Sequence, residues 1–80
     1  MKHTQYFIHT RSRPHQSAII DEWINQALVE PIRVQTQSDG RIRFWVFIPE
    51  AGRYLRVMTL ADGETVHNAF FDRTFKESPA

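Results

Sequence analysis

The sequence predicts an α+β domain in which one N-terminal amphipathic helix packs on an antiparallel meander of four to five strands, in the order β-α-β-β-β-β. Three turn pairs, Asp39-Gly40, Ala51-Gly52 and Asp62-Gly63, lie eleven or twelve residues apart, between runs rich in β-branched and aromatic residues. This spacing is typical of hairpins joined in series. Before the turns, apolar residues recur at helical spacing, which predicts the helix.

The length of 80 residues fits one domain, residues 1–80, with an ordered core at about 6–73 and a frayed tail at 74–80. The hydrophobic content of 41% is enough for one small core. The absence of cysteine excludes disulfides and thiolate metal sites and favours a reducing compartment. No apolar stretch has the length of a membrane span or a signal-peptide core, so we expect a cytoplasmic protein with no membrane partner.

The first elements are an edge strand and the helix. Tyr6-Phe7-Ile8 is a short apolar run that predicts the strand. The helix is predicted from about residue 14 to 29, where Pro14 suits its first turn and Pro31 ends it. Its apolar stripe follows the i, i+3, i+4, i+7, i+8 pattern and consists of Ile20, Trp23, Ile24, Ala27 and Leu28.

Four further strands are predicted at about 32–37, 41–48, 53–60 and 64–71. If each glycine pair forms a two-residue loop, Val46 lies opposite Val57 and Leu55 lies opposite Phe70, on one apolar face that the helix covers. Asn68 falls on the same face in this register. The phase of the first hairpin is open, because a bulge or a loop one residue longer would turn its first strand over.

The reverse face of the sheet is half apolar and half cationic. It carries Arg41, Arg43, Trp45, Arg56, Met58 and His67. Eight of the ten cationic residues of the chain are arginine, whose planar fork pairs with phosphate and stacks on bases. This pattern indicates RNA binding, with Arg41, Arg43 and Arg56 on phosphates and Trp45 stacked on a base, a contact that contributes about 1–3 kcal/mol.

Two other interpretations of this face stay open. An exposed strip of Trp45, Phe47 and Met58 would suit a homodimer or the docking of a partner protein. The face could equally be structural, with arginine stems covering the apolar side chains.

Candidate catalytic residues are His67, His9 and Arg56. Histidine titrates near neutrality and can move the proton of a ribose 2′-hydroxyl, while arginine stabilises the charged phosphorane. Arg11 and Arg13, beside His9 before the helix, and Arg73, after the last strand, are further candidates for RNA binding. The chain has no nucleotide-binding loop, metal-ligand spacing or acyl-transfer motif, so we expect no cofactor and no metal.

Four short segments of the chain form a recognisable series. They are His9-Thr10-Arg11-Ser12-Arg13, a helix ending Val29-Glu30-Pro31, the turn Gln37-Ser38-Asp39-Gly40-Arg41, and the strand Tyr54-Leu55-Arg56-Val57. Together they resemble a family of small bacterial proteins near the RelE and BrnT toxins, and the resemblance spans about residues 6–73.

The resemblance implies a RelE-like fold and a metal-independent endoribonuclease of a toxin-antitoxin pair. It implies that RNA, including ribosome-associated mRNA, and a cognate antitoxin-like small protein are the partners. His9, Arg11 and Arg13 match the basic segment of the family, and Arg41 and Arg56 match its sheet arginines. The chain departs from the family at Arg13-Pro14, where the family has an Arg-Gly pair.

Overall fold

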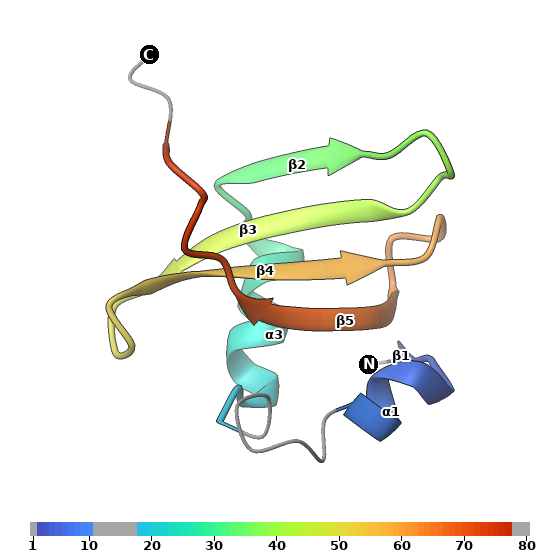
Figure 1. Cartoon of the computed structure of the whole chain (residues 1–80), viewed down its shortest axis with the longest axis horizontal. Coiled ribbons are helices and arrows are strands. Elements are labelled where there is room, and N and C mark those ends of the chain that lie inside the picture. The colour runs from blue at the N-terminus through green and yellow to red at the C-terminus, as the bar shows by residue number, and fades with distance from the viewer. Residues whose placement is uncertain (1, 11–17, 78–80) are drawn as a thin grey trace.

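The computed structural model describes residues 2–10 and 18–77, which form two helices and a five-stranded mixed sheet (Figure 1). The elements are β1 (Lys2–His3), α1 (Gln5–Thr10), α3 (Asp21–Val29), β2 (Arg33–Thr36), β3 (Ile42–Ile48), β4 (Arg53–Thr59) and β5 (Thr65–Phe71). The strand order is β1-β5-β4-β3-β2, with β1 parallel to β5 and the other neighbours antiparallel. The predicted α+β class is confirmed.

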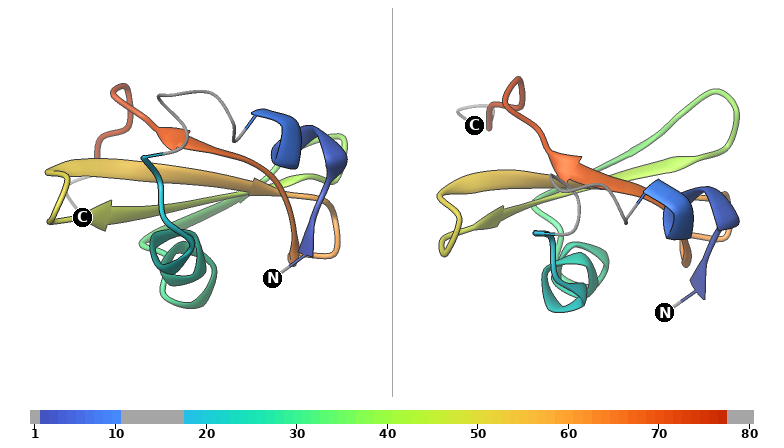
Figure 2. Two further views of the ribbon diagram at one scale, coloured as in Figure 1. Left: turned by 90° about the horizontal axis from the view of Figure 1, so that it is seen from below. Right: turned by 60° about the horizontal axis from the view of Figure 1, so that its bottom comes forward.

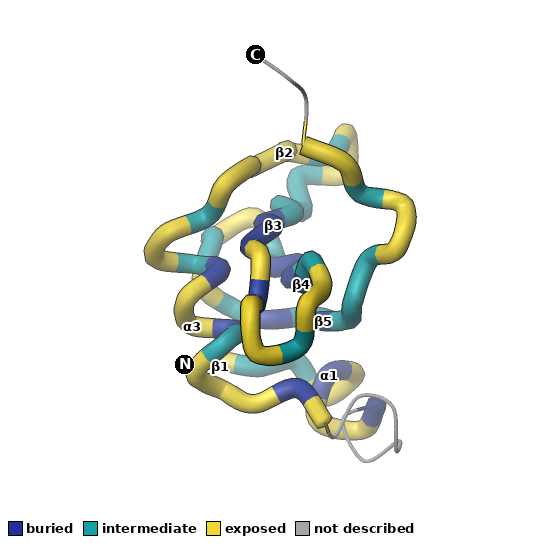
Figure 3. The backbone as a smooth tube through the Cα atoms, turned by 90° about the vertical axis from the view of Figure 1, so that its left-hand side faces the viewer, coloured by how far each residue is buried: buried dark blue, intermediate teal, exposed yellow. Residues whose placement is uncertain are grey.

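The sheet has a different cover on each face. Helix α3 lies on one face, while residues 72–77 cross the opposite face (Figures 1 and 2). Helix α1 packs beside β5, next to the edge that β1 forms. At the other edge, all four residues of β2 are exposed (Figure 3).

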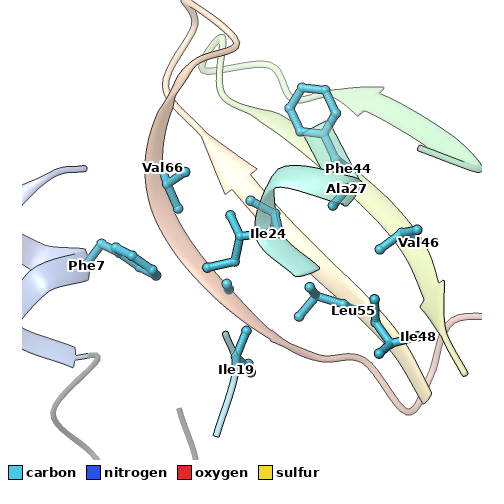
Figure 4. Packing of buried hydrophobic residues seen from close by; sticks show 11 residues of the cluster. Phe7, Ile19, Ile24, Ala27, Phe44, Val46, Ile48, Leu55 and Val66 are labelled. Atoms are coloured by element: carbon cyan, nitrogen blue, oxygen red, sulfur yellow. The ribbon is translucent and has the colours of Figure 1, made fainter. Parts of the chain in front are cut away.

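Helix α3 buries the predicted apolar stripe, but it begins later than predicted. Ile24 and Ala27 are fully buried against the sheet, and Trp23 and Leu28 pack around them (Figure 4). Among the described residues the helix begins at Asp21, because Ile20 has extended backbone angles. Ile20 is therefore 43% exposed, and its neighbour Ile19, at 2%, enters the core in its place.

The predicted strand Tyr6-Phe7-Ile8 is wrong, because these residues lie in α1. The hydroxyl of Thr4 accepts a hydrogen bond from the Phe7 amide at 3.1 Å, which is the side-chain contact that begins a helix. Phe7 is buried in the core, whereas Tyr6 and Ile8 point to solvent. The edge strand is instead β1, two residues long and parallel to the start of β5.

The β3–β4 loop is four residues long rather than two. The Ile48 carbonyl accepts from the amides of Ala51 and Gly52, so residues 49–52 form the loop and Ile48 pairs with Arg53. Pro49 has no N–H and cannot continue the ladder. The pairing shifts by two residues, so Val46 lies opposite Leu55. A shift of two keeps every side chain on its predicted face.

A bulge in β5 changes the faces in the last hairpin. Thr59 pairs with Val66 but Met58 pairs with Asn68, which leaves His67 as an extra residue. Beyond the bulge, Val57 pairs with Ala69. The prediction that Asn68 lies on the core face is therefore wrong, since Ala69 takes that place and is buried.

The first hairpin takes the longer loop that the sequence left open. The Gln37 amide donates to the Arg41 carbonyl, and Arg33 pairs with Trp45. Val34 therefore lies opposite Phe44, on the helix side of the sheet. As a result, β2 presents arginine and glutamine, rather than valine, on the face opposite the helix.

Candidate nucleic-acid interface

Three strands build a cationic row on the face opposite α3. Trp45 of β3 pairs with Arg33 of β2 on one side and with Arg56 of β4 on the other. One step along the strands, Arg43 pairs with Gln35. The core residues alternate with these positions, so their side chains share the face away from the helix. We call Arg33, Gln35, Arg43, Trp45 and Arg56 the arginine platform.

The arginine platform lines an open hollow of about 380 Å³ together with the C-terminal segment, which we define as residues 72–77. Four cations, Arg33, Arg43, Arg56 and Lys76, line the hollow with one carboxylate, Asp72. This excess of positive charge attracts anions.

Arg56 is the most constrained cation of the platform. Its guanidinium carbon lies 4.1 Å from the centroid of the Phe70 ring, and its buried Nε has no hydrogen-bond partner among the described residues. Burial, and then the charge of Arg43, lower the pKa of Arg56, while Asp72 opposes this shift. Since arginine does not lose its proton in proteins, Arg56 remains a cation with an unused donor.

Trp45 lies on the predicted face but is covered. Only 5% of it is exposed, and the Phe75 ring stacks on the indole at 5.2 Å between centroids and 22° between planes. The indole Nε1 donates to Asp72 Oδ2 at 3.1 Å. The prediction of an open base-stacking surface is therefore wrong for this conformation, because Phe75 holds the position that a base would take.

The apolar strip proposed for protein docking is also mostly covered. Met58, like Trp45, is buried, and only Phe47, at 39%, is exposed. Phe47 packs edge-on against Tyr54, with 5.1 Å between ring centroids. One exposed ring does not make an apolar docking surface of the predicted kind.

His67 lies away from the platform, at the bulge of β5. Its Nδ1 is 3.1 Å from Thr4 Oγ1, and its ring stacks on Tyr6 with 4.8 Å between centroids. Burial, and then the charge of Arg41, lower its pKa below the ordinary value of 6.5. Arg56 pairs with Phe70, three residues farther along β5, which corresponds to about 10 Å of strand. The predicted pair of His67 and Arg56 is therefore not brought together.

The other candidates lie outside the arginine platform or outside the described residues. His9 is in the last turn of α1 and is exposed. Arg41 is in the β2–β3 loop, where its Nε lies 3.9 Å from Asp39 Oδ2. Arg73 lines a different hollow, beside Arg53. Arg11 and Arg13 lie outside the described residues.

Several contributors to the site were missed in the sequence, and these are Arg33, Gln35, Phe75 and Lys76. Arg33 joins the platform only because the first hairpin loop is one residue longer than predicted. Arg33 and Gln35 alternate along β2, but the sequence could not show which face of the sheet they lie on until the length of that loop was known. Phe75 lies in the expected frayed tail. The available signal was Asp72 two residues before Thr74, since aspartate at that spacing accepts from the following backbone and fixes a turn.

Comparisons of the chain with protein families, with curated proteins and with solved structures find no match. Within residues 2–10 and 18–77, no three histidine, aspartate or glutamate side chains gather where they could hold a metal ion. In the same part of the chain, no helix is long and apolar enough to cross a membrane.

Proposed function

We propose that this domain binds single-stranded RNA in the cytoplasm, as a toxin-like RNA-binding domain that acts through the arginine platform. The observation that carries the proposal is the gathering of Arg33, Arg43 and Arg56 around one open hollow with a single opposing carboxylate. Arginine pairs with two phosphate oxygens at once, and a flat sheet suits a single strand whose bases are unstacked. The resemblance to RelE-type toxins favours RNA over DNA.

The test is the salt dependence of binding to a fluorescent oligouridine. If the three platform arginines each contact a phosphate, log K should fall against log salt with a slope of about −2, since each contact to a single strand contributes about −0.7. In the variant Arg43→Gln/Arg56→Gln, affinity should fall and the slope should shrink to about −0.7.

The matched control is Lys2→Ala/Arg53→Ala, which removes the same charge outside the platform. Lys2 pairs with Glu64 at the surface, and Arg53 lies over Phe71 on the other face of the sheet. Equal losses of affinity in both double variants would reject the platform as the binding site. A deoxyuridine oligomer of the same length tests the preference for RNA.

A second proposal is metal-independent cleavage of the bound RNA, with His67 as the proton-transfer group and Arg41 as the cation beside it. The support for this second proposal is that burial and the charge of Arg41 lower the pKa of His67 and so favour its neutral form. A neutral imidazole can accept a proton from a 2′-hydroxyl. Cleavage of labelled RNA in excess chelator should disappear in His67→Ala and persist in His9→Ala. Cleavage that survives His67→Ala would reject this assignment.

The proposed partner is a small antitoxin-like protein that covers the arginine platform. An acidic segment would match the platform's charge and compete with RNA for Arg43 and Arg56. If the chain instead forms a stable homodimer in light scattering and shows no RNA affinity, the interaction-module interpretation is favoured.

A further inference from the structure

The C-terminal segment lies across the place where RNA would bind. Figure 1 looks onto the face of the sheet opposite α3 and shows residues 72–77 crossing in front of β4 and β3. The Phe75 ring stacks nearly parallel on Trp45, and its centroid lies 4.9 Å from that of Tyr54. Phe75 borders the hollow of the arginine platform and two neighbouring hollows, one lined by Arg33 and the other by Arg53.

The segment is held by few contacts. The Asp72 amide donates to the Tyr54 carbonyl at 2.8 Å, and Asp72 Oδ1 accepts from the Thr74 amide at 3.0 Å. Among the described residues, no backbone hydrogen bond joins residues 73–77 to the sheet. Asp72 also accepts from the Trp45 indole, so it anchors the start of the segment. Residues 73–77 are held to the sheet through the Phe75 ring, which lies against Trp45 and Tyr54, and they can separate from it without breaking a strand.

The segment presents an aromatic ring where an RNA base would stack. Phe75 lies nearly parallel on the indole of Trp45. The carboxylates of Asp72 and Glu77 line hollows beside Arg56 and Arg33, and Lys76 lines the same hollow as Asp72. The competition therefore concerns the stacking position on Trp45, which either Phe75 or a base can occupy.

We propose that residues 73–77 are a built-in competitor of RNA, which occupies the base-stacking site on Trp45 and has to separate from it before a base can stack there. This inference rests on the proposed RNA binding. It assigns Trp45 to base stacking in the open form, and it makes Phe75 an inhibitory residue rather than a binding residue.

The test compares Phe75→Ala with the unchanged chain, both carrying Trp23→Phe so that Trp45 is the only fluorophore of its type. Phe75→Ala should increase the quenching of Trp45 fluorescence by acrylamide, because the indole is uncovered. It should also tighten oligouridine binding at least about fivefold, which is the order of effect of stacking one base. Binding of oligouridine should then quench Trp45 fluorescence more strongly than in the unchanged chain. A chain ending at Arg73 should behave in the same way. Phe47→Ala, which removes an aromatic ring of the same face outside the segment, is the control and should leave the affinity unchanged.

A measurement on the unchanged chain avoids any effect of substitution on folding. The Phe75 ring protons, stacked on the indole, should show upfield-shifted NMR signals that move to unstacked positions as oligouridine saturates the protein.

The outcomes separate the two proposals. If Phe75→Ala does not tighten binding while Arg43→Gln/Arg56→Gln still reduces it, the competitor inference is overturned, but RNA binding stands. Weaker binding in Phe75→Ala would in addition make Phe75 part of the binding surface. If Phe75 signals remain shifted at saturation, the inference is overturned as well. If no form binds RNA, the proposed function fails and the inference fails with it.

Discussion

At the scale of single residues, strand alternation predicted which side chains share a face, but not what covers them. Arg43, Trp45 and Arg56 lie together as expected, because a shift of two residues in the β3–β4 register preserves the faces. The cover on Trp45 could not be predicted, since Phe75 lies in a stretch with neither strand nor helix pattern. His67 is separated from Arg56 by a bulge in β5, and no residue pattern in the sequence predicts that bulge.

The titration of His67 is the first testable property at this scale. Because burial and Arg41 both disfavour the imidazolium, an NMR titration should give a midpoint below the ordinary value of 6.5. Protonation then favours the unfolded chain, so the stability contributed by neutral His67 is present above pH 6.5 and is lost as the pH falls from 6.5 to the midpoint of the folded chain.

The variant Arg41→Ala should raise the pKa of His67 part of the way back, because it removes the smaller of the two causes. Arg53→Ala is the control and should leave the midpoint unchanged. A midpoint that does not move in Arg41→Ala would remove Arg41 from the surroundings of His67.

At the scale of elements, the turns decide how much of the sheet can be predicted. The glycines of all three loops were identified, and Gly52, with φ of 64°, occupies the left-handed region that favours glycine. The first two loops are longer than the two residues predicted. The hydrogen bond from Gln37 to Arg41 closes the longer β2–β3 loop, and Pro49 ends the β3–β4 ladder early. The N-terminal helix was missed because a helix of six residues with only three consecutive apolar side chains gives no clear period.

The β4–β5 turn should make the protein sensitive to acid. Asp62 Oδ1 accepts from the amides of Glu64 and Thr65, and the hydrogen bonds from Thr65 are the main cause of a pKa of about 2, below the ordinary 3.8. A carboxylate with a depressed pKa stabilises the fold above pH 4, and this contribution is lost as the pH falls from about 4 to about 2.

Asp62→Asn keeps a side-chain oxygen for the backbone amides but does not titrate. Its melting temperature should therefore fall less than that of the unchanged chain between pH 5 and pH 2, as measured by circular dichroism. Asp39→Asn, in the first hairpin loop, is a matched control of the same chemistry. If both variants and the unchanged chain lose stability in parallel, the turn is not the acid-sensitive element.

At the scale of the whole molecule, stability depends on one layer of side chains between α3 and the sheet. Ile24 is fully buried there among Leu55, Val57 and Val66 of the core cluster. A domain of this size has only about 5–10 kcal/mol of stability to lose. The helix stripe and the apolar strand face were both predicted, so the core is the best-predicted part of the fold.

Shortening Ile24 should therefore have a graded effect. Ile24→Val should lower the free energy of unfolding by about 1 kcal/mol and Ile24→Ala by about 2–5 kcal/mol, because the cavity left behind grows with the atoms removed. Urea denaturation measures both values. Val29→Ala, at an exposed position of the same helix, should cost well under 1 kcal/mol. Equal effects at residues 24 and 29 would contradict the packing of α3 on the sheet.

The parallel pairing of β1 with β5 has a consequence for the order of assembly. The hydrogen bond from the Thr4 amide to the Val66 carbonyl joins residues that are far apart in the sequence. Bringing them together costs loop-closure entropy, which contacts formed earlier in folding have to offset. We therefore expect β1 to pair with β5 late in folding, and it should be the first strand to open. In hydrogen exchange, the Thr4 amide should exchange far faster than that of Val57; equal protection would mean that the whole sheet opens as one unit.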